Sequence, residues 1–213
     1  MDANEKAIRQ RLKSDFEHYA AKCLKIRTKS GKIEPLILND AQIHIHNCVE
    51  EQREKTGKVR AIILKGRQEG CSTYIEARFY WRVSHQRGVR AFILTHEEEA
   101  TNNLFELANR YHENCPAPVK PSTSAANAKE LYFDKLDSGY KVGTAGNKAV
   151  GRSSTVQFFH GSEVAFWPNA KQHSAGIIQA IPDEDGTEIS KESTANGGGE
   201  ELNTDGQDAE AGL

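Results

Sequence analysis

The sequence predicts an α/β fold in which a mostly parallel β-sheet is flanked by helices. Three short apolar runs have the length and the β-branched or aromatic content of buried strands: RAIIL (60–64), RAFILT (90–95) and TVQFF (155–159). Longer segments with helical periodicity separate these runs along the chain. Strands that alternate with helices form βαβ units, and the strands of such units run parallel.

The residues before the first of these strands are expected to add a helix and a β-hairpin to the core. Apolar residues recur at steps of three and four over 4–25, which predicts an amphipathic helix. The segment 26–38 contains a Ser-Gly turn between two short runs, as in a hairpin. Asn39 or Asp40 can cap the next helix, which should end near Gly57.

Two further helices are predicted, one from Ser72 to about His85 and one over 97–115. The second has acidic residues in its first turn, where a negative charge interacts favourably with the helix dipole. The proline-bearing segment 115–128 is expected to be a loop, and 130–145 a hairpin.

The chain divides into three parts by composition. Residues 1–58 and the core, 59–196, are expected to form one domain, since 213 residues suffice for one sizeable α/β domain. The remainder, 197–213, is acidic and has almost no apolar residues, so we expect it to be a disordered tail.

Net charge and hydropathy restrict the classes of partner. The formal charge is −2, but 1–181 holds 27 basic and 20 acidic residues, which makes this body basic. A basic body is compatible with a polyanionic partner, although solvated lysines on an ordinary surface explain it as well. No apolar run approaches the roughly 20 residues that span a bilayer, and the N-terminus lacks the apolar core of a signal peptide. We therefore expect no membrane partner.

The stretch AIILKGRQEGCST (61–73) has the layout of a phosphate-binding loop, in which an apolar strand leads into a glycine-containing turn and a helix. Cys71 stands where the GxxxxGK[ST] pattern has its lysine, and Lys65 stands where it has its first glycine. The cation of such a loop would then come from Lys65 or Arg67. By itself this pattern is more often a simple connection than a binding site. The candidate binding residues of the loop are Lys65, Gly66, Arg67, Gln68, Glu69, Gly70, Cys71, Ser72 and Thr73.

Two other stretches strengthen the interpretation of this loop. LILNDAQ places Asn39 and Gln42 at the start of a capped helix, and STVQFFHGSEVAFWPNA places Glu163 at the end of an apolar strand. In open α/β sheets, ligands bind at the carboxyl ends of the strands. Glu163 can therefore face phosphates that are bound by the 65–73 loop.

Together these stretches resemble the ATPase domain of the large terminase subunit, the DNA-packaging motor of tailed bacteriophages. The matching features are an L-N-x-x-Q motif, a Walker A motif with its lysine displaced to the front, and a Walker B strand that ends in an acid. ESTANG (192–197) is similar to the coupling motif of the family, and the resemblance covers about residues 12 to 197. It implies a RecA-like P-loop NTPase of the ASCE type that uses ATP and Mg²⁺.

The resemblance also implies roles for individual residues at the phosphates. Glu163 would be the catalytic carboxylate that activates the attacking water and would also lie at the metal. Lys65 would contact the β- and γ-phosphates, and Arg67 would act as a cis arginine finger. Ser72 would bind Mg²⁺. Ser162 occupies the position where the family commonly has the Walker B aspartate, which leaves the surroundings of the metal in doubt.

Other positions would act around this centre. Asn39 and Gln42 would contact adenine, the glutamine through the paired donor and acceptor of its amide. The coupling residues would be Thr194, Asn196 and Gly197. The glycine-containing loop 146–155 carries Lys148 and Arg152, which could touch DNA or reach a neighbouring subunit as a trans finger. A solvent-exposed loop without such a role is an equally ordinary interpretation.

The implied partners are double-stranded DNA, the small terminase subunit and the portal protein, with a ring homo-oligomer as the working form in the host cytoplasm. No nuclease activity is expected, because the chain ends about 16 residues after the coupling motif. Two alternatives stay open at this point. One is an inactive nucleotide- or DNA-binding module, and the other is a DNA-dependent ATPase of helicase type.

Overall fold

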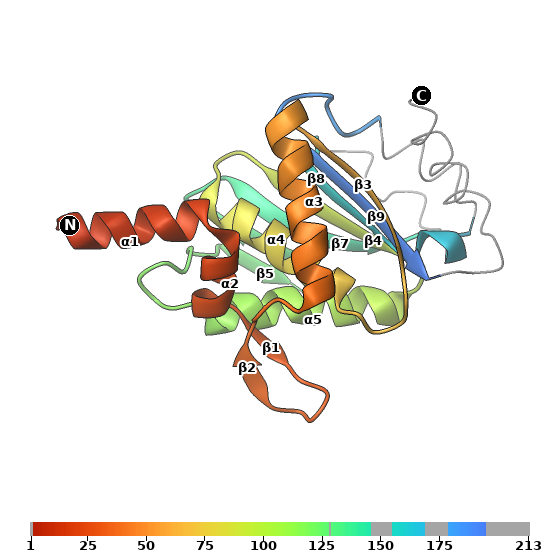
Figure 1. Cartoon of the computed structure of the whole chain (residues 1–213), viewed down its shortest axis with the longest axis horizontal. Helices are drawn as coiled ribbons and strands as arrows, with labels where there is room; N and C mark the ends of the chain where they lie inside the picture. Colours follow the sequence, from red (N-terminus) through yellow and green to blue (C-terminus); the bar gives the residue numbers. More distant parts are fainter. Residues whose placement is uncertain (1, 128, 146–154, 169–178, 195–213) are drawn as a thin grey trace.

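The computed structural model describes residues 2–127, 129–145, 155–168 and 179–194, and its main body is a twisted sheet covered by helices (Figure 1). In these residues a seven-stranded sheet has the order β3-β9-β8-β4-β7-β6-β5. The first five strands pair in parallel, whereas β6 and β5 add antiparallel pairs at one edge. The predicted mostly parallel sheet is therefore confirmed. The strands are β3 (Val59–Lys65), β4 (Arg90–Thr95), β5 (Ala125–Asn127), β6 (Glu130–Phe133), β7 (Ser138–Thr144), β8 (Phe158–Ser162) and β9 (Glu188–Thr194).

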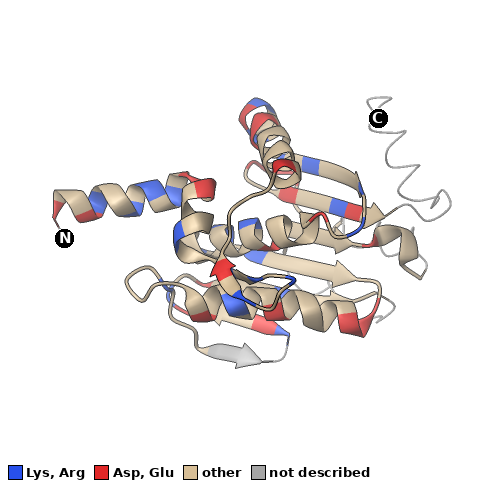
Figure 2. Cartoon of the chain, turned by 60° about the horizontal axis from the view of Figure 1, so that its bottom comes forward, with Lys and Arg blue, Asp and Glu red and all other residues tan. Residues whose placement is uncertain are grey.

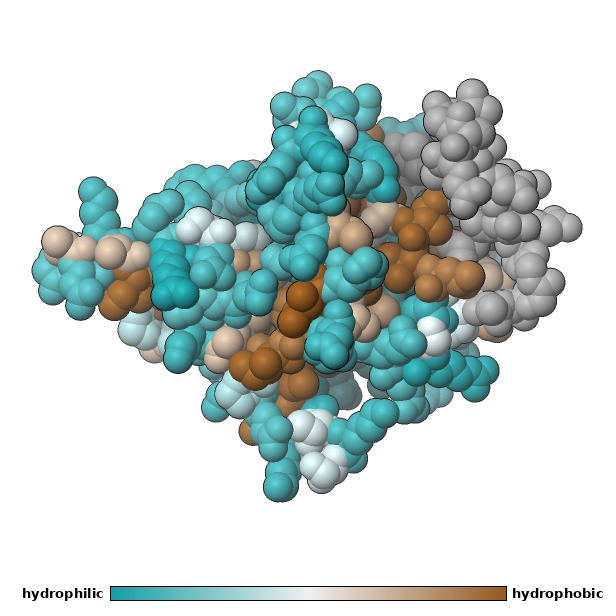
Figure 3. All heavy atoms as spheres, viewed as in Figure 1, coloured by the Kyte–Doolittle hydropathy of each residue, from teal (hydrophilic) through white to brown (hydrophobic). Residues whose placement is uncertain are grey.

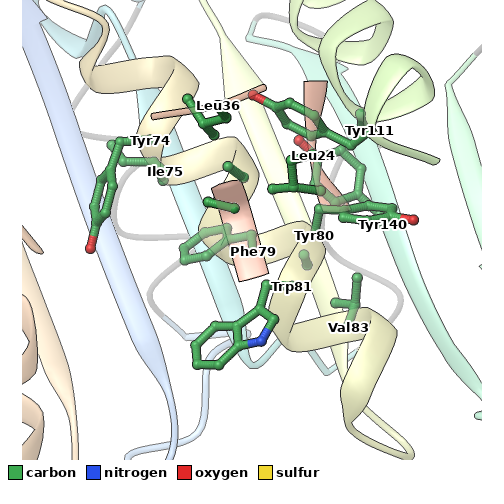
Figure 4. Packing of buried hydrophobic residues seen from close by; sticks show 14 of the residues in the cluster. Leu24, Leu36, Tyr74, Ile75, Phe79, Tyr80, Trp81, Val83, Tyr111 and Tyr140 are labelled. Atoms are coloured by element: carbon green, nitrogen blue, oxygen red, sulfur yellow. The ribbon is translucent and has the colours of Figure 1, made fainter. Parts of the chain in front are cut away.

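Three helices lie on one face of this sheet, namely α3 (Asp40–Thr56), α4 (Cys71–His85) and α5 (Glu98–Asn114) (Figure 1). The central helix α4 is buried over most of its surface, because it packs against the sheet and also against α3 and α5. Figure 4 shows how its large side chains fill the main core together with residues of other elements: Tyr74, Ile75, Phe79, Tyr80 and Trp81, with Leu24 and Leu36.

A second hydrophobic cluster covers the opposite face of the sheet. Strand β4 contributes to both clusters, since Ile93 packs on the helical side and Phe92 and Leu94 pack on the other. Trp167 joins the second cluster just after the short 3₁₀ helix η1 (Val164–Phe166). A strand that is buried on both faces needs a continuous apolar run, which is why 90–95 could be predicted from sequence with its bounds.

The N-terminal helix predicted over 4–25 is divided into two helices, which corrects that prediction. Helix α1 (Ala3–Ser14) ends before Asp15, and α2 (Phe16–Cys23) starts after it. Asp15 has an extended backbone with φ −123°, and its side chain accepts a hydrogen bond from the backbone N–H of His18. An aspartate that caps a new helix competes with continuation of the old one. The predicted hairpin follows as β1 (Lys25–Arg27) and β2 (Ile33–Pro35), paired antiparallel.

Helix α3 begins with a capping box. The Asn39 side chain accepts from the backbone N–H of Gln42, and the Gln42 side chain accepts from the backbone N–H of Asn39. Gly57 ends the helix in the left-handed conformation, with φ 75°, which glycine adopts without steric penalty. Local sequence sets both ends of this helix, and the predicted helix from Asn39 or Asp40 to near Gly57 agrees with α3.

Strand β3 is not a buried strand, contrary to the prediction for 60–64. It is an edge strand among the described residues, and Ile62 and Leu64 are 37% and 67% exposed. Figure 3 shows hydrophobic surface beside α3 in this part of the molecule.

Strand β8 runs over 158–162 instead of the predicted 155–159, and β5 lies inside the predicted loop 115–128. The predicted apolar run 155–159 thus includes three residues that precede β8 and the first two residues of the strand.

Strand β9 was not predicted at all, although it lies between β3 and β8. Its sequence EISKEST is polar, and yet six of its seven residues are buried. Hydrophobic patterning cannot detect such a strand, since its side chains are buried through ion pairs and hydrogen bonds. Strand β9 brings 188–194 next to the phosphate-binding loop.

No helix among the described residues is long and apolar enough to cross a membrane. In the view of Figure 2, acidic and basic residues are interspersed along α1 and along the other helices.

Candidate functional site

The candidate site lies where the parallel strands β3, β8 and β9 end. Lys65 is the last residue of β3, Glu163 follows β8 directly, and Thr194 ends β9. Parallel pairing brings these carboxyl ends to one edge of the sheet, and Lys65 is in register with Thr194. Glu163 lies beside Lys65, the first residue of the 65–73 loop, and its expected position facing bound phosphates stays a prediction.

The loop between β3 and α4 contains two residues with positive φ, Gln68 at 61° and Gly70 at 80°. Gly70 occupies the N-cap position of α4, and its carbonyl accepts from the N–H of Tyr74. A non-glycine residue in the left-handed region is strained, so Gln68 must be held by its surroundings. The N–H groups at the start of α4 lie next to this loop, which is the arrangement that binds anions.

Asn39 and Gln42 hold the loop from the side of α3. Asn39 Nδ2 donates to the carbonyl of Glu69 at 3.1 Å, and Gln42 Nε2 donates to the carbonyl of Gly70 at 2.8 Å. Gln42 is only 4% exposed, and its Oε1 accepts from the backbone of Asn39. In this structure the Gln42 amide therefore positions the loop between β3 and α4. Adenine contact by these two residues stays a prediction.

Replacing Gly70 with alanine is expected to destabilise the protein and to loosen this loop. A Cβ at Gly70 would lie 2.7 Å from Gln42 Nε2, and the left-handed φ itself disfavours alanine by about 1–2 kcal/mol. Chemical denaturation should show a larger loss than for Gly31→Ala, which has φ +82° but no atom within 4 Å of the new Cβ. Equal losses for the two variants would mean that the Gln42 contact contributes nothing.

Lys65 reaches two carboxylates from the end of β3. Its Nζ lies 3.3 Å from Glu163 Oε1 and 3.4 Å from Glu192 Oε2, and its side chain is 10% exposed. Burial lowers the pKa of Lys65, but the charges of Glu192 and Glu163 outweigh this and raise it, so the amine stays protonated. Cys71, at the usual lysine position, is 2% exposed and begins α4, where a lysine would have to be buried.

Glu163 is held by the end of β9. Its backbone is left-handed, with φ 52°, and its Oε2 accepts from the Thr194 N–H at 3.0 Å and from Thr194 Oγ1 at 3.1 Å. Burial raises the pKa of Glu163, but the Thr194 hydrogen bond and the Lys65 charge together lower the pKa by more than burial raises it. The carboxylate is therefore ionised at neutral pH. A strained residue with a fixed, charged side chain is typical of functional sites.

A pocket of about 360 Å³ opens beside these groups. The exposed side chain of Arg67 lines it together with His96 and Phe166. A second pocket, of about 480 Å³, lies between α3 and β3 and also reaches Lys65. A charged ligand over the 65–71 loop would thus have room on both sides of Lys65.

Behind the loop lies a buried polar network that sequence reasoning missed. Glu192, on β9, is fully buried and accepts a hydrogen bond from Ser72 Oγ and another from Ser162 Oγ at 3.2 Å. His160 Nε2 lies 3.2 Å from Glu192 Oε1, and His160 Nδ1 lies 2.5 Å from Glu76 Oε1. The signals were present, since Glu192 opens the ESTANG stretch and His160 precedes Ser162 in FHGSE.

The charges in this network favour an ionised Glu192. Burial raises its pKa, but hydrogen bonding and the charge of His160, with Lys65 and Ser72, hold the pKa at about 2. Burial lowers the pKa of His160, whereas Glu192 and Glu76 raise it to about 9. A buried carboxylate therefore stands next to the predicted metal ligand Ser72.

The remaining predicted residues fall into two groups. Gly66 and Glu69 lie in the loop, and the Thr73 carbonyl accepts from Tyr111 Oη at 3.2 Å. The predicted DNA-contact or trans-finger residues and the last two coupling residues lie outside the described residues: Lys148, Arg152, Asn196 and Gly197. Among the described residues, no group of three His, Cys, Asp or Glu side chains could hold a metal ion by itself.

Comparison with known proteins identifies the fold. No family model and no curated protein sequence matches the chain. Among solved structures, the HK97 bacteriophage large terminase superposes with a TM-score of 0.68 at 13% identity, covering 85% of this chain and 37% of that one. The Thermus phage P74-26 large terminase ATPase domain gives 0.57 at 19% identity, covering 75% and 65%. A large terminase from a thermophilic bacteriophage gives 0.55 at 11% identity, covering 74% and 39%.

Proposed function

We propose that this chain, which has the fold of the ATPase domain of phage large terminases, is an ATP-hydrolysing motor domain that powers the packaging of double-stranded DNA. The observation that carries the proposal is the meeting of Lys65, Glu163 and the 65–73 loop at the carboxyl ends of parallel strands. The chain spans about a third of the length of the HK97 large terminase, so packaging by a whole terminase is part of the proposal.

In the proposed mechanism, the phosphates of ATP bind over the 66–71 backbone N–H groups and the N-terminus of α4. Lys65 would neutralise phosphate oxygens from the end of β3, and the Ser72 hydroxyl oxygen would help to hold Mg²⁺. When bound, the metal would supply positive charge next to the phosphates. The exposed side chain of Arg67 lines the same pocket, and we propose that it approaches the γ-phosphate as a cis finger.

Glu163 is the proposed catalytic carboxylate, which orients the attacking water and accepts its proton. Ionisation at neutral pH, supported by its lowered pKa, suits this role. Thr194 holds Glu163 through two hydrogen bonds, so a shift of β9 would change the position of the carboxylate. We propose this contact as the link by which the coupling residues Thr194, Asn196 and Gly197 respond to hydrolysis.

The proposed partners are double-stranded DNA, the small terminase subunit and the portal protein, and the proposed setting is the cytoplasm of the host. The proposed working form is a ring, in which Arg152 of one subunit could complete the site of its neighbour. Lys148 and Arg152 are equally candidates for DNA contact.

Glu163→Gln is expected to abolish Mg²⁺-dependent ATP hydrolysis while nucleotide binding is retained. The amide keeps the size of the side chain and one acceptor oxygen for Thr194, but it carries no charge and cannot accept a proton from water. Phosphate release should be measured with and without double-stranded DNA, alongside binding of a fluorescent ATP analogue. We expect a loss of roughly 10²–10⁴-fold in turnover, the contribution of a positioned general base.

Glu99→Gln, which changes a carboxylate on the first turn of α5, serves as the matched control and should leave turnover unchanged. Turnover by Glu163→Gln at the wild-type rate would remove Glu163 from the mechanism. Tight ATP binding by the wild type without any turnover, even with DNA and at high protein concentration, would favour the inactive binding module.

A further inference from the structure

Strand β8 ends in Ser162, and the carboxylate that follows it, Glu163, is the proposed catalytic group, so position 162 lacks the separate aspartate expected at a magnesium site in this fold. In P-loop proteins, Mg²⁺ is held by the loop hydroxyl and by an aspartate from a neighbouring strand. Ser162 stands at that place here, and a neutral hydroxyl cannot supply the missing negative charge. Ser162 pairs in register with Glu192 on β9, so the next strand brings a carboxylate to the same level of the sheet.

Glu192 makes the contacts that the missing aspartate would make. Its Oε1 accepts the hydrogen bond of Ser72 Oγ, the predicted metal-binding hydroxyl, and also that of Ser162 Oγ. A hydroxyl that donates its proton to a carboxylate has its lone pairs free for a cation. The orientation of Ser72 in this structure therefore already suits a metal ligand.

The second carboxylate oxygen of Glu192 provides a separate observation that indicates a ligand at this place. Glu192 Oε2 is buried and has no hydrogen-bond partner among the described residues, although Lys65 Nζ lies 3.4 Å away. Lys65 compensates the charge of this oxygen, but a buried acceptor that makes no hydrogen bond is uncommon and needs an explanation. A metal-bound water at this place would donate the missing hydrogen bond, and Lys65 would then be released toward the phosphates.

We propose that Glu192 is the carboxylate of the magnesium site and replaces the aspartate that is absent at position 162. This proposal rests on the proposed function, because it concerns the metal that accompanies the nucleotide. Glu192 acts through the water shell of the metal and through Ser72.

His160 and Glu76 act as positioning residues for Glu192. Both are fully buried, and His160 bridges the two carboxylates from β8. Burying three ionisable groups is unfavourable unless they are paired, and a hydrophobic core of the same volume would be at least as stable. Their presence behind Ser72 is explained if they fix the direction of the Glu192 carboxylate.

The test compares nucleotide affinity with and without Mg²⁺ in variants of the full chain. Fluorescent ADP titrations in Mg²⁺ and in EDTA give the gain in affinity due to the metal, and Mn²⁺ electron paramagnetic resonance with ADP reports metal binding directly. For Glu192→Gln, we expect the metal-dependent gain and the Mn²⁺ affinity to fall about 10- to 100-fold, with affinity in EDTA within about threefold of wild type.

The double variant Ser162→Asp/Glu192→Gln should recover most of the metal-dependent gain, because it returns a carboxylate to the neighbouring position of the sheet. Ser190→Ala, on the same strand and on the same face two residues earlier, should leave the gain unchanged. Melting curves accompany each titration, so that the comparison is made among folded proteins.

An unchanged metal-dependent gain in folded Glu192→Gln would overturn the proposal and leave Glu192 a structural core residue. Failure of the double variant to recover more than Glu192→Gln alone would also count against it. If the wild type binds no nucleotide in either buffer, the proposed function itself fails, and this proposal fails with it. Turnover that is lost in Glu163→Gln while Glu192→Gln keeps its metal response would reject only the role of Glu192.

Discussion

Arg78→Leu is expected to lower the free energy of unfolding by about 3–5 kcal/mol, the range found when one partner of a buried ion pair is removed. Arg78 lies on α4 and is 2% exposed. Its Nε and Nη2 donate to Glu188 at 2.7 and 3.0 Å, and its Nη1 donates to Glu50 at 2.5 Å. Leucine would leave the carboxylate of Glu188, which is 1% exposed, with Arg82 as its one remaining ion-pair partner in the part of the chain that the structure describes, 3.3 Å from Oε1.

Urea denaturation followed by circular dichroism should measure this loss. Arg9→Leu is the matched control, because Arg9 pairs with Glu5 on α1 with both side chains more than 40% exposed, and its loss should cost well under 1 kcal/mol. The double variant Arg78→Leu/Glu188→Leu should be more stable than Arg78→Leu alone, since no charge at position 188 is left buried without its partner. A single-variant loss below about 1 kcal/mol would show that water or Arg82 replaces Arg78 fully.

Lys65→Ala is expected to weaken ATP binding roughly 10²–10³-fold, within the range found when one partner of a buried charge pair between two binding partners is removed. The reason is electrostatic on two counts. The phosphates lose a cation, and Glu163 and Glu192 lose the charge that separates them from a polyanionic ligand. Isothermal titration calorimetry with a non-hydrolysable ATP analogue measures the change directly.

Lys58→Ala provides the control for Lys65→Ala. Lys58 directly precedes the same strand, pairs with the exposed Asp183 and lies away from the loop, so its removal should leave the affinity within about threefold of wild type. If Lys65→Ala also stays within that range, then Arg67 or another cation binds the phosphates, and the displaced-lysine interpretation of 65–73 is wrong.

The elements that the sequence predicted well are those set by local chemistry or by a continuous apolar run. The capping residues of α3 and the left-handed Gly57 determine both ends of that helix. Strand β4 was predicted with its bounds because both of its faces are buried. The order of strands and helices was enough to predict a mostly parallel sheet, and the structural comparison bears out the resemblance at the level of the fold.

Elements whose placement depends on partners far along the chain were predicted poorly or not at all. Asp15 divides the N-terminal helix through a cap that competes with the preceding turn, and periodicity over 4–25 does not reveal this. The apolar composition of β3 predicts a buried strand, but its position at the edge of the described sheet leaves Leu64 exposed. The strand order that decides such exposure is a property of the whole sheet.

The candidate site divides in the same way. The sequence alone identified the candidate phosphate-binding loop, the acid at position 163 and the absence of an acid at position 162, because each of these is a local feature of the chain. Only the tertiary structure decided that Gln42 holds the loop and that Glu192 lies against Ser72, 120 residues away. The physical reason is that β9 is buried through charge pairing, and the partners of its charges come from other strands and helices that only folding brings together.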